Sequence, residues 1–96
     1  MVAPRWTESS WKHGIDRLDQ VFALANATFV DELDQPETDG GRVRIYIGPR
    51  HSQTDDEIEL LVKYFPDGRE AVVFHAMRLG PKYRRYREEH SDGFRS

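Results

Sequence analysis

The clearest structural signal in this chain lies at residues 57–78, which read EIELLVKYFPDGREAVVFHAMR. Apolar side chains alternate with other side chains along residues 57–65, whereas residues 70–77 are apolar on both faces. The Pro-Asp-Gly sequence at 66–68 is typical of a tight turn, so the two segments are predicted to form a hairpin. A strand that is apolar on both faces is buried on both, so we expect residues 70–77 to lie inside a sheet.

Two further strands are expected on the N-terminal side of this hairpin. Residues 28–33 include a β-branched and aromatic run, and an alternating apolar pattern covers residues 42–47. A loop at 34–41, which contains a proline and two adjacent glycines, separates them. Short connections between successive strands favour an antiparallel meander of four strands.

Helices are expected near both ends of the chain. The first covers residues 7–13 and stops at Gly14, and the last begins with Pro81 and runs to about residue 90. The second covers residues 16–25, where apolar residues recur at helical spacing. Together with Ile15 they form one stripe that should face the core: Leu18, Val21, Phe22 and Ala25.

These elements predict an α+β fold, with N-terminal helices, a four-stranded antiparallel meander sheet and a C-terminal helix arranged in two layers. With 96 residues and a mass of 11.2 kDa, the chain has the length of a single domain. Residues 1–6 are expected to form a flexible leader and residues 91–96 a flexible tail.

The composition excludes several kinds of site. The chain has no cysteine, which rules out disulfide scaffolds, thiolate zinc sites and cysteine nucleophiles. Its four histidines fit no zinc motif, and no glycine-rich phosphate loop is present, so we expect neither a metal nor a cofactor. The acidic group at 55–57 could hold a hard cation, or it could be ordinary solvated charge.

The sequence also predicts where the protein resides. The longest apolar run, at residues 21–25, is far too short to cross a membrane. Residues 1–6 lack the basic start and apolar stretch of a signal peptide. We therefore expect a soluble cytoplasmic protein with no membrane partner.

Charge is distributed unevenly along the chain. The formal net charge is −3, but residues 1–41 carry three basic and eight acidic residues, whereas residues 42–96 carry eleven basic and nine acidic ones. Residues 78–87 contain no acid and interleave basic residues with tyrosines: Arg78, Lys82, Tyr83, Arg84, Arg85, Tyr86 and Arg87. Such a segment at a helix start suits a phosphate-bearing ligand such as RNA. The alternative is a solvated helix face balanced by Glu88 and Glu89.

His75 is the most informative histidine, because it stands in an otherwise apolar strand on the expected face of Val73 and Met77. A buried imidazole needs hydrogen-bond partners, so His75 could be a core residue bonded to the backbone or to a tyrosine. It could equally be a general acid or base, which, with Arg78 and Lys82 beside it, would have the parts for metal-free RNA cleavage. Strand alternation puts His75 and Arg78 on opposite faces unless a bulge intervenes.

The order of short motifs resembles the BrnT-like toxins of bacterial type II toxin–antitoxin modules, which have the RelE-like ribonuclease fold. The matching segments lie between residues 8 and 90: Lys12-His13-Gly14-Ile15, Val21-Phe22, the strand with Arg44, Ile47-Gly48, residues 60–64, and residues 72–78 followed by a helix with tyrosines. The family's last strand reads Ile-Ile-Ser-Ala-Arg, so His75 has no direct counterpart and Arg78 matches only approximately.

The resemblance implies a metal-independent endoribonuclease that inhibits translation by cleaving RNA and is neutralised by an antitoxin protein encoded nearby. The residues that would carry catalysis are His75, Arg78, Arg44 and His13, and those that would bind RNA are Lys82, Tyr83, Arg84, Arg85 and Tyr86. His13 matches the motif histidine and Arg44 the strand arginine. At the end of a helix, His13 could instead have a purely structural role through the helix dipole.

The sequence also fits a second function. The acidic character of residues 1–41 suits a basic partner protein better than it suits RNA. The chain could then be a non-catalytic binding module that pairs with a small antitoxin-like or regulatory partner.

Overall fold

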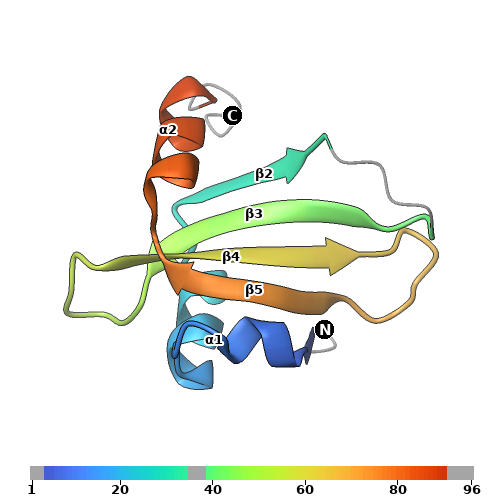
Figure 1. The fold of residues 1–96 in the computed structure, drawn as a ribbon, viewed down its shortest axis with the longest axis horizontal. Coiled ribbons are helices and arrows are strands. Elements are labelled where there is room, and N and C mark those ends of the chain that lie inside the picture. Colours follow the sequence, from blue (N-terminus) through green and yellow to red (C-terminus); the bar gives the residue numbers. More distant parts are fainter. Residues whose placement is uncertain (1–3, 35–38, 91–96) are drawn as a thin grey trace.

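The computed structural model describes residues 4–34 and 39–90, in which five strands form a single sheet (Figure 1). In chain order the elements are β1 (Arg5–Trp6), the short 3-10 helix η1 (Glu8–Trp11), α1 (Arg17–Ala25), β2 (Phe29–Leu33), β3 (Arg42–Pro49), β4 (Glu57–Tyr64), β5 (Val72–Arg78) and α2 (Pro81–Glu89). The strand order across the sheet is β1-β5-β4-β3-β2. The pairs β2/β3, β3/β4 and β4/β5 are antiparallel, whereas β1 runs parallel to β5.

The prediction of an α+β fold is confirmed, but the sheet is five-stranded and mixed rather than four-stranded and antiparallel. The additional strand, β1, lies in the segment predicted to be a flexible leader, and its Trp6 pairs with Val73. Two residues are too few to show an alternating pattern, so periodicity does not reveal such a strand. Residues 1–3 of the expected leader and the expected tail at 91–96 lie outside the described residues.

The first predicted helix, at residues 7–13, is only the 3-10 helix η1. Ser10 Oγ donates a hydrogen bond to the carbonyl oxygen of Thr7 at 2.6 Å, and Ser9 Oγ donates to that of Phe74 in β5, also at 2.6 Å. Serine hydroxyls that bond to nearby backbone compete with α-helical hydrogen bonds, which accounts for the short element. Gly14 follows it with a positive φ of 72°, in agreement with its predicted role as a left-handed stop.

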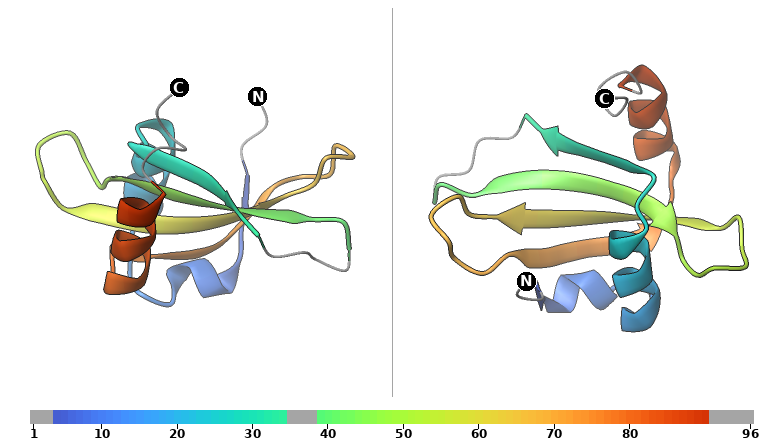
Figure 2. Two further views of the ribbon diagram at one scale, coloured as in Figure 1. Left: turned by 90° about the horizontal axis from the view of Figure 1, so that it is seen from above. Right: turned by 180° about the vertical axis from the view of Figure 1, so that it is seen from behind.

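The two α-helices cover opposite faces of the sheet, so the domain has three layers rather than the predicted two (Figure 2). Helix α1 packs on the face that carries Ile58 and Leu60 of β4, which we name the α1 face. Helix α2 packs through Tyr83 on the other face, which carries Ile45 and Ile47 of β3 and which we name the α2 face. The short helix η1 lies beside β5, at the edge of the sheet and on the same side as α2 (Figure 2).

Helix α1 turns a different side to the sheet from the one that its apolar stripe predicts. Leu18 and Val21 are 82% and 46% exposed, whereas Gln20 and Ala23 are fully buried. Close backbone packing explains the difference, because a Cβ atom at Gly48 of β3 would lie only 2.6 Å from the carbonyl oxygen of Ala23. Only small residues allow the helix to approach the strand this closely.

Gln20 is the polar residue buried beneath α1. Its Nε2 donates hydrogen bonds to the carbonyl oxygens of Ser10 and Ile15, at 3.2 and 2.9 Å. These bonds satisfy two backbone acceptors in the connection between η1 and α1. They explain why a carboxamide is buried here although position 20 does not belong to the predicted apolar stripe.

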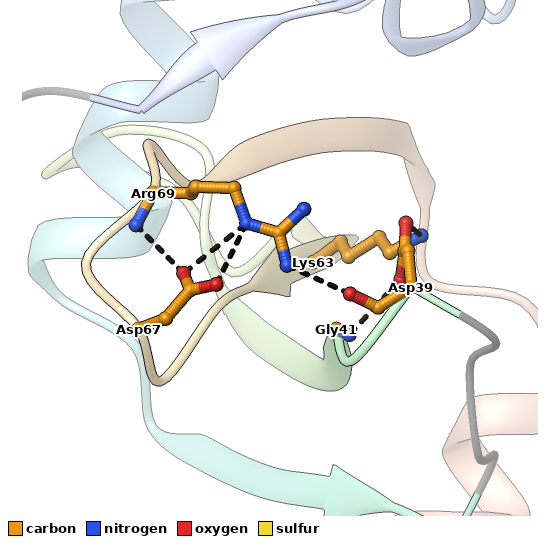
Figure 3. Close-up of polar contacts among 5 residues, drawn as sticks. All are labelled: Asp39, Gly41, Lys63, Asp67 and Arg69. Carbon is orange, nitrogen blue, oxygen red and sulfur yellow. Dashed lines mark hydrogen bonds and ion pairs between the residues drawn. The ribbon is translucent and has the colours of Figure 1, made fainter.

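A network of ion pairs joins two turns at the end of the sheet farthest from α2 (Figure 3). The Asp39 carboxylate lies 2.7 Å from Lys63 Nζ and accepts a hydrogen bond from the backbone N–H of Gly41. Arg69 donates to the carbonyl oxygen of Asp39 and pairs with Asp67. The hydrogen bond from Lys63 lowers the pKa of Asp39. The network ties the start of β3 to the turn between β4 and β5.

Candidate active site

A buried carboxylate and a half-buried histidine form a pair between β4 and β5. Nε2 of His75 lies 2.9 Å from Oε2 of Glu59, and the other carboxylate oxygen, Oε1, accepts a hydrogen bond from the backbone N–H of Gly80 at 2.9 Å. The Glu59 side chain is 4% exposed, whereas that of His75 is 24% exposed. The carboxylate is therefore enclosed, while the imidazole is open to solvent on one side.

A β-bulge in β5 sets the direction of His75. His75 pairs with Leu61 and Val73 pairs with the next residue of β4, Val62, so Phe74 is an extra residue in its strand. We predicted His75 on the face of Val73 and Met77. It does share a face with Met77, but the prediction is wrong for Val73, because the bulge puts the side chains of His75 and Val73 on opposite faces. Bulges commonly redirect side chains in this way. His75 lies on the α2 face, where Phe74 also packs.

The ring of His13 contacts the ring of His75. Their centroids are 5.6 Å apart and their planes make an angle of 72°, an edge-to-face arrangement. His13 follows η1, and η1 is held against β5 by the bond from Ser9 Oγ to Phe74 and by a second bond from the backbone N–H of Thr7 to Val73. Pairing of the N-terminal segment with β5 thus brings together two histidines from opposite ends of the chain.

Two imidazoles side by side can serve as a proton acceptor and a proton donor. Imidazole is the side chain that exchanges protons near neutral pH, and a second imidazole allows one proton to be removed and another delivered in one reaction. The buried carboxylate of Glu59 fixes the orientation of one of the two rings. We therefore take His13, His75 and Glu59 as the candidate active site.

Arg44 and Arg78, two of the predicted catalytic residues, do not join this group. Arg44 pairs across the sheet with Val62, on the α1 face, and its guanidinium lies 4.1 Å from the ring centroid of Tyr64. Arg78 is three positions beyond His75 in a regular stretch of β5, so strand alternation separates the two. The Arg78 side chain is 71% exposed and lies 3.6 Å from Asp56.

The two tyrosines predicted to bind RNA are directed into the fold. Tyr83 is only 6% exposed, and its burial leaves no ring face free for stacking on a base. The hydroxyl of Tyr86 donates a 2.6 Å hydrogen bond to Asp31, and the ring stacks on His90 with 3.9 Å between centroids. Burial, followed by the bond to Asp31, raises the pKa of Tyr86 to about 12. Both rings anchor α2 to the sheet.

The basic residues of α2 divide into paired and exposed ones. Arg87 forms a two-pronged ion pair with Glu57, at 2.7 and 3.2 Å. Lys82, Arg84 and Arg85 are exposed. Lys82 belongs to the first turn of α2, two residues after Gly80, whose N–H is bonded to Glu59.

Two of the three acidic residues at 55–57 are engaged with arginines, Asp56 with Arg78 and Glu57 with Arg87. Within residues 4–34 and 39–90, no three His, Asp or Glu side chains come together as the ligands of a metal ion would. Among the described helices, none has the length and apolar character needed to cross a membrane.

Glu59 is the site residue that our sequence analysis missed. It belongs to β4, which also carries Glu57 and Lys63 and which forms a hairpin with the strand that carries His75. In an antiparallel pair, residues diagonal to each other on one face are close enough for long side chains to meet. An acid between two apolar residues of one strand and a histidine in the other strand of the hairpin were therefore a signal of a buried pair.

Comparison of the chain with models of protein families, with curated proteins and with solved structures gives no match.

Proposed function

We propose that the protein is a metal-independent endoribonuclease, the toxin of a type II toxin–antitoxin module. The observation that carries the proposal is the contact of His13 and His75, 5.6 Å between centroids, beside the buried Glu59. His13 comes from the Lys12-His13-Gly14-Ile15 motif, the most distinctive part of the resemblance to BrnT-like toxins. That motif and the last strand, which are far apart in the sequence, meet at the candidate active site.

The reaction that fits two imidazoles is transphosphorylation within RNA. One neutral imidazole takes the proton of the ribose 2′-hydroxyl, and the 2′-oxygen then forms a bond to the adjacent phosphorus. The bond from phosphorus to the 5′-oxygen breaks, its electron pair goes to that oxygen, and the other imidazole, protonated, supplies the proton. The products are a 2′,3′-cyclic phosphate and a 5′-hydroxyl end, and no metal ion takes part in this mechanism.

Cations are needed near these imidazoles to stabilise the charge on the phosphate. Lys12 precedes His13 directly, and Lys82 lies in the first turn of α2, two residues after Gly80, whose N–H is bonded to Glu59. Both are exposed. In this proposal Lys12 and Lys82 stabilise the charge on the phosphate, a role that the sequence assigned to Lys82 and Arg78.

The test is cleavage of messenger RNA by the purified chain in the presence of EDTA, with and without ribosomes. We expect cleavage with cyclic-phosphate and 5′-hydroxyl ends, and a loss of at least about a hundredfold in His75→Ala. His51→Ala is the matched control, because His51 lies in the exposed loop between β3 and β4. Absence of cleavage under all conditions, abolition by EDTA, or equal cleavage by His75→Ala would each contradict the proposal.

A second candidate function, a protein-binding module, is favoured by a different observation. Leu18, Val21 and Trp11 are 82%, 46% and 37% exposed, which leaves apolar side chains of α1 and η1 uncovered. Glu8 and Asp16 are exposed in the same segment, and so are Lys12 and Arg17, whose guanidinium lies 5.2 Å from the ring centroid of Trp11. An exposed apolar surface of this kind suits a partner protein such as an antitoxin.

Co-expression with the product of the neighbouring gene distinguishes the two functions. A toxin arrests growth when it is expressed alone and is neutralised by its partner. A pure binding module forms the complex, loses it in the Leu18→Glu/Val21→Glu variant, and causes no arrest by itself. Growth arrest that His75→Ala abolishes would exclude the purely non-catalytic function.

A further inference from the structure

We propose that Glu59 is a positioning residue that holds His75 as the tautomer protonated on Nε2, so that Nδ1 is the atom that exchanges a proton with the substrate. The part of this inference that concerns the substrate rests on the proposed ribonuclease function. The part that concerns the tautomer does not, and it can be tested separately.

Glu59 cannot act on a substrate itself. The residue is 3% exposed, and each of its carboxylate oxygens already has a partner, Gly80 N–H for Oε1 and His75 Nε2 for Oε2, both at 2.9 Å. A general acid or base must reach the proton that it transfers. Any effect of Glu59 on a reaction must therefore pass through its two partners, His75 and the start of α2 at Gly80.

The hydrogen-bond chemistry of Glu59 selects one tautomer of His75. An ionised carboxylate only accepts hydrogen bonds, and a neutral imidazole carries one proton on either Nδ1 or Nε2. Because Nε2 faces Oε2, the proton of the neutral ring must be on Nε2 for a hydrogen bond to form. Nδ1 is then the unprotonated nitrogen of the ring, and its lone pair can accept a proton.

The surroundings of His75 leave Nδ1 available for proton transfer with a substrate. Within the described part of the chain, Nδ1 forms no hydrogen bond, whereas Nε2 is bonded to Glu59. The His75 side chain is 24% exposed, and the edge-to-face contact with His13 is on the same ring. One nitrogen is thus fixed by the protein, and the other is unoccupied.

Glu59 also connects His75 to the start of α2. Gly80 is the N-cap residue of that helix, and its N–H is bonded to the same carboxylate that holds the imidazole. A negative charge at a helix N-terminus is favourable. Glu59 therefore has a structural role as well, and the test must use a readout that this structural role does not determine.

The readout is the tautomer of His75, and Glu59→Gln is the variant that should change it. Glutamine has nearly the same shape as glutamate, but its side chain ends in one oxygen and one amide nitrogen. If its oxygen accepts the Gly80 N–H, its NH₂ group faces Nε2 of His75, and that nitrogen must become an acceptor. The proton of His75 then moves to Nδ1. The opposite orientation of the carboxamide would set its NH₂ against the Gly80 N–H, two donors facing each other.

The experiment is a long-range proton–nitrogen correlation spectrum of the full chain labelled with nitrogen-15, recorded at alkaline pH where imidazoles are neutral. The signals of His75 are assigned from their absence in His75→Gln. We expect the Nε2–H tautomer in the wild type and the Nδ1–H tautomer in Glu59→Gln. Glu57→Gln, the same change two residues away in β4, should leave the His75 signals unchanged, because Glu57 pairs with Arg87.

RNA cleavage by the same samples completes the test. Glu59→Gln should lose at least about a hundredfold in rate, and Glu57→Gln should cleave like the wild type. If the tautomer inverts but Glu59→Gln cleaves at the wild-type rate, Nδ1 is not the working atom and the inference is overturned. If the wild type itself does not cleave RNA, the proposed function fails, whereas an inverted tautomer would still support the positioning role.

The wild-type spectrum alone keeps the inference testable if Glu59→Gln does not fold. An Nδ1–H tautomer of His75 in the wild type would overturn it directly. Glu59→Asp is the second variant, since a carboxylate at this position still only accepts hydrogen bonds and should preserve the Nε2–H tautomer. A change to the Nδ1–H form in Glu59→Asp would also contradict the inference.

Discussion

The rings of His13 and His75 meet edge to face, 5.6 Å apart between centroids, although His13 lies before α1 and His75 lies in the last strand. The contact depends on how η1 lies along β5, because Ser9 Oγ bonds to the carbonyl oxygen of Phe74 at the bulge. Neither a single helix nor a single strand produces it. The candidate active site is thus a product of the tertiary fold.

Replacing His13 and His75 by alanine, singly and together, tests whether the two rings act as a unit. Each single variant should lower the initial rate of RNA cleavage by about a hundredfold. The double variant should lose little more than either single one, because residues that act in the same step are strongly non-additive. A double variant whose loss equals the product of the two single losses would show that the rings act independently.

The sequence predicted His13 and His75 as site residues by two different arguments, one from the resemblance and one from an odd polar residue in an apolar strand. It could not predict that they touch, because a bulge at Phe74 and a two-residue strand at β1 decide where each lies. Arg44 was assigned to the same site, but the structure places it on the other face of the sheet, for a related reason. Alternation gives the two faces of each strand, but only the register across the sheet tells which faces coincide.

The rotation of α1 gives a prediction about stability. Ile15 and Leu18 belong to one predicted apolar stripe, but Ile15 is 4% exposed and Leu18 is 82% exposed. Ile15→Ala should lower the free energy of unfolding by about 2–5 kcal/mol, whereas Leu18→Ala should change it by less than about 0.5 kcal/mol. Urea unfolding of both variants measures the difference. Similar losses in the two variants would mean that α1 packs through its predicted stripe.

The apolar pattern identified α1 as a helix but did not predict which side of it faces the sheet, because the pattern carries no information about close packing of the backbone. Ala23 and Gly48 bring the helix and β3 together, and the bonds of Gln20 fix the rotation of the helix. The strands were predicted more fully, since alternation with a Pro-Asp-Gly turn depends on local sequence. The arrangement of the layers was not predicted, because both faces of β4 carry apolar side chains and the sequence does not say which helix covers which face.

The contact of Gly48 with Ala23 should not tolerate even one additional carbon atom. In Gly48→Ala the new Cβ would lie 2.6 Å from the carbonyl oxygen of Ala23 and 3.1 Å from the Cα of Ala27. Because both neighbours are backbone atoms, α1 must shift, and the free energy of unfolding should fall by about 1–3 kcal/mol. Adding Ala23→Gly should not restore stability, since it removes no atom that clashes. Rescue by that second change would contradict a backbone contact.

Tyr86 makes the stability of the protein depend on alkaline pH. Burial and the hydrogen bond to Asp31 raise its pKa to about 12, whereas a tyrosine in an unfolded chain titrates near pH ~10. Because the folded value is the higher one, the stabilisation by the protonated phenol is fully present below pH ~10 and is lost as the pH rises from there through the folded value. Tyr86→Phe should lower the free energy of unfolding by about 1–2 kcal/mol at neutral pH, since it removes the bond to a carboxylate.

The same variant should remove this contribution to the alkaline pH dependence. Urea unfolding of the wild type and Tyr86→Phe, compared from pH ~8 to pH ~12, measures the effect, and the two curves should converge across the window in which Tyr86 titrates only in the wild type. Absorbance of the folded wild type should show a tyrosine with a pKa of about 12 that is missing from Tyr86→Phe. Curves that remain parallel to the alkaline limit would mean that the Tyr86 hydroxyl is not held by Asp31 and that α2 is anchored by its buried rings alone.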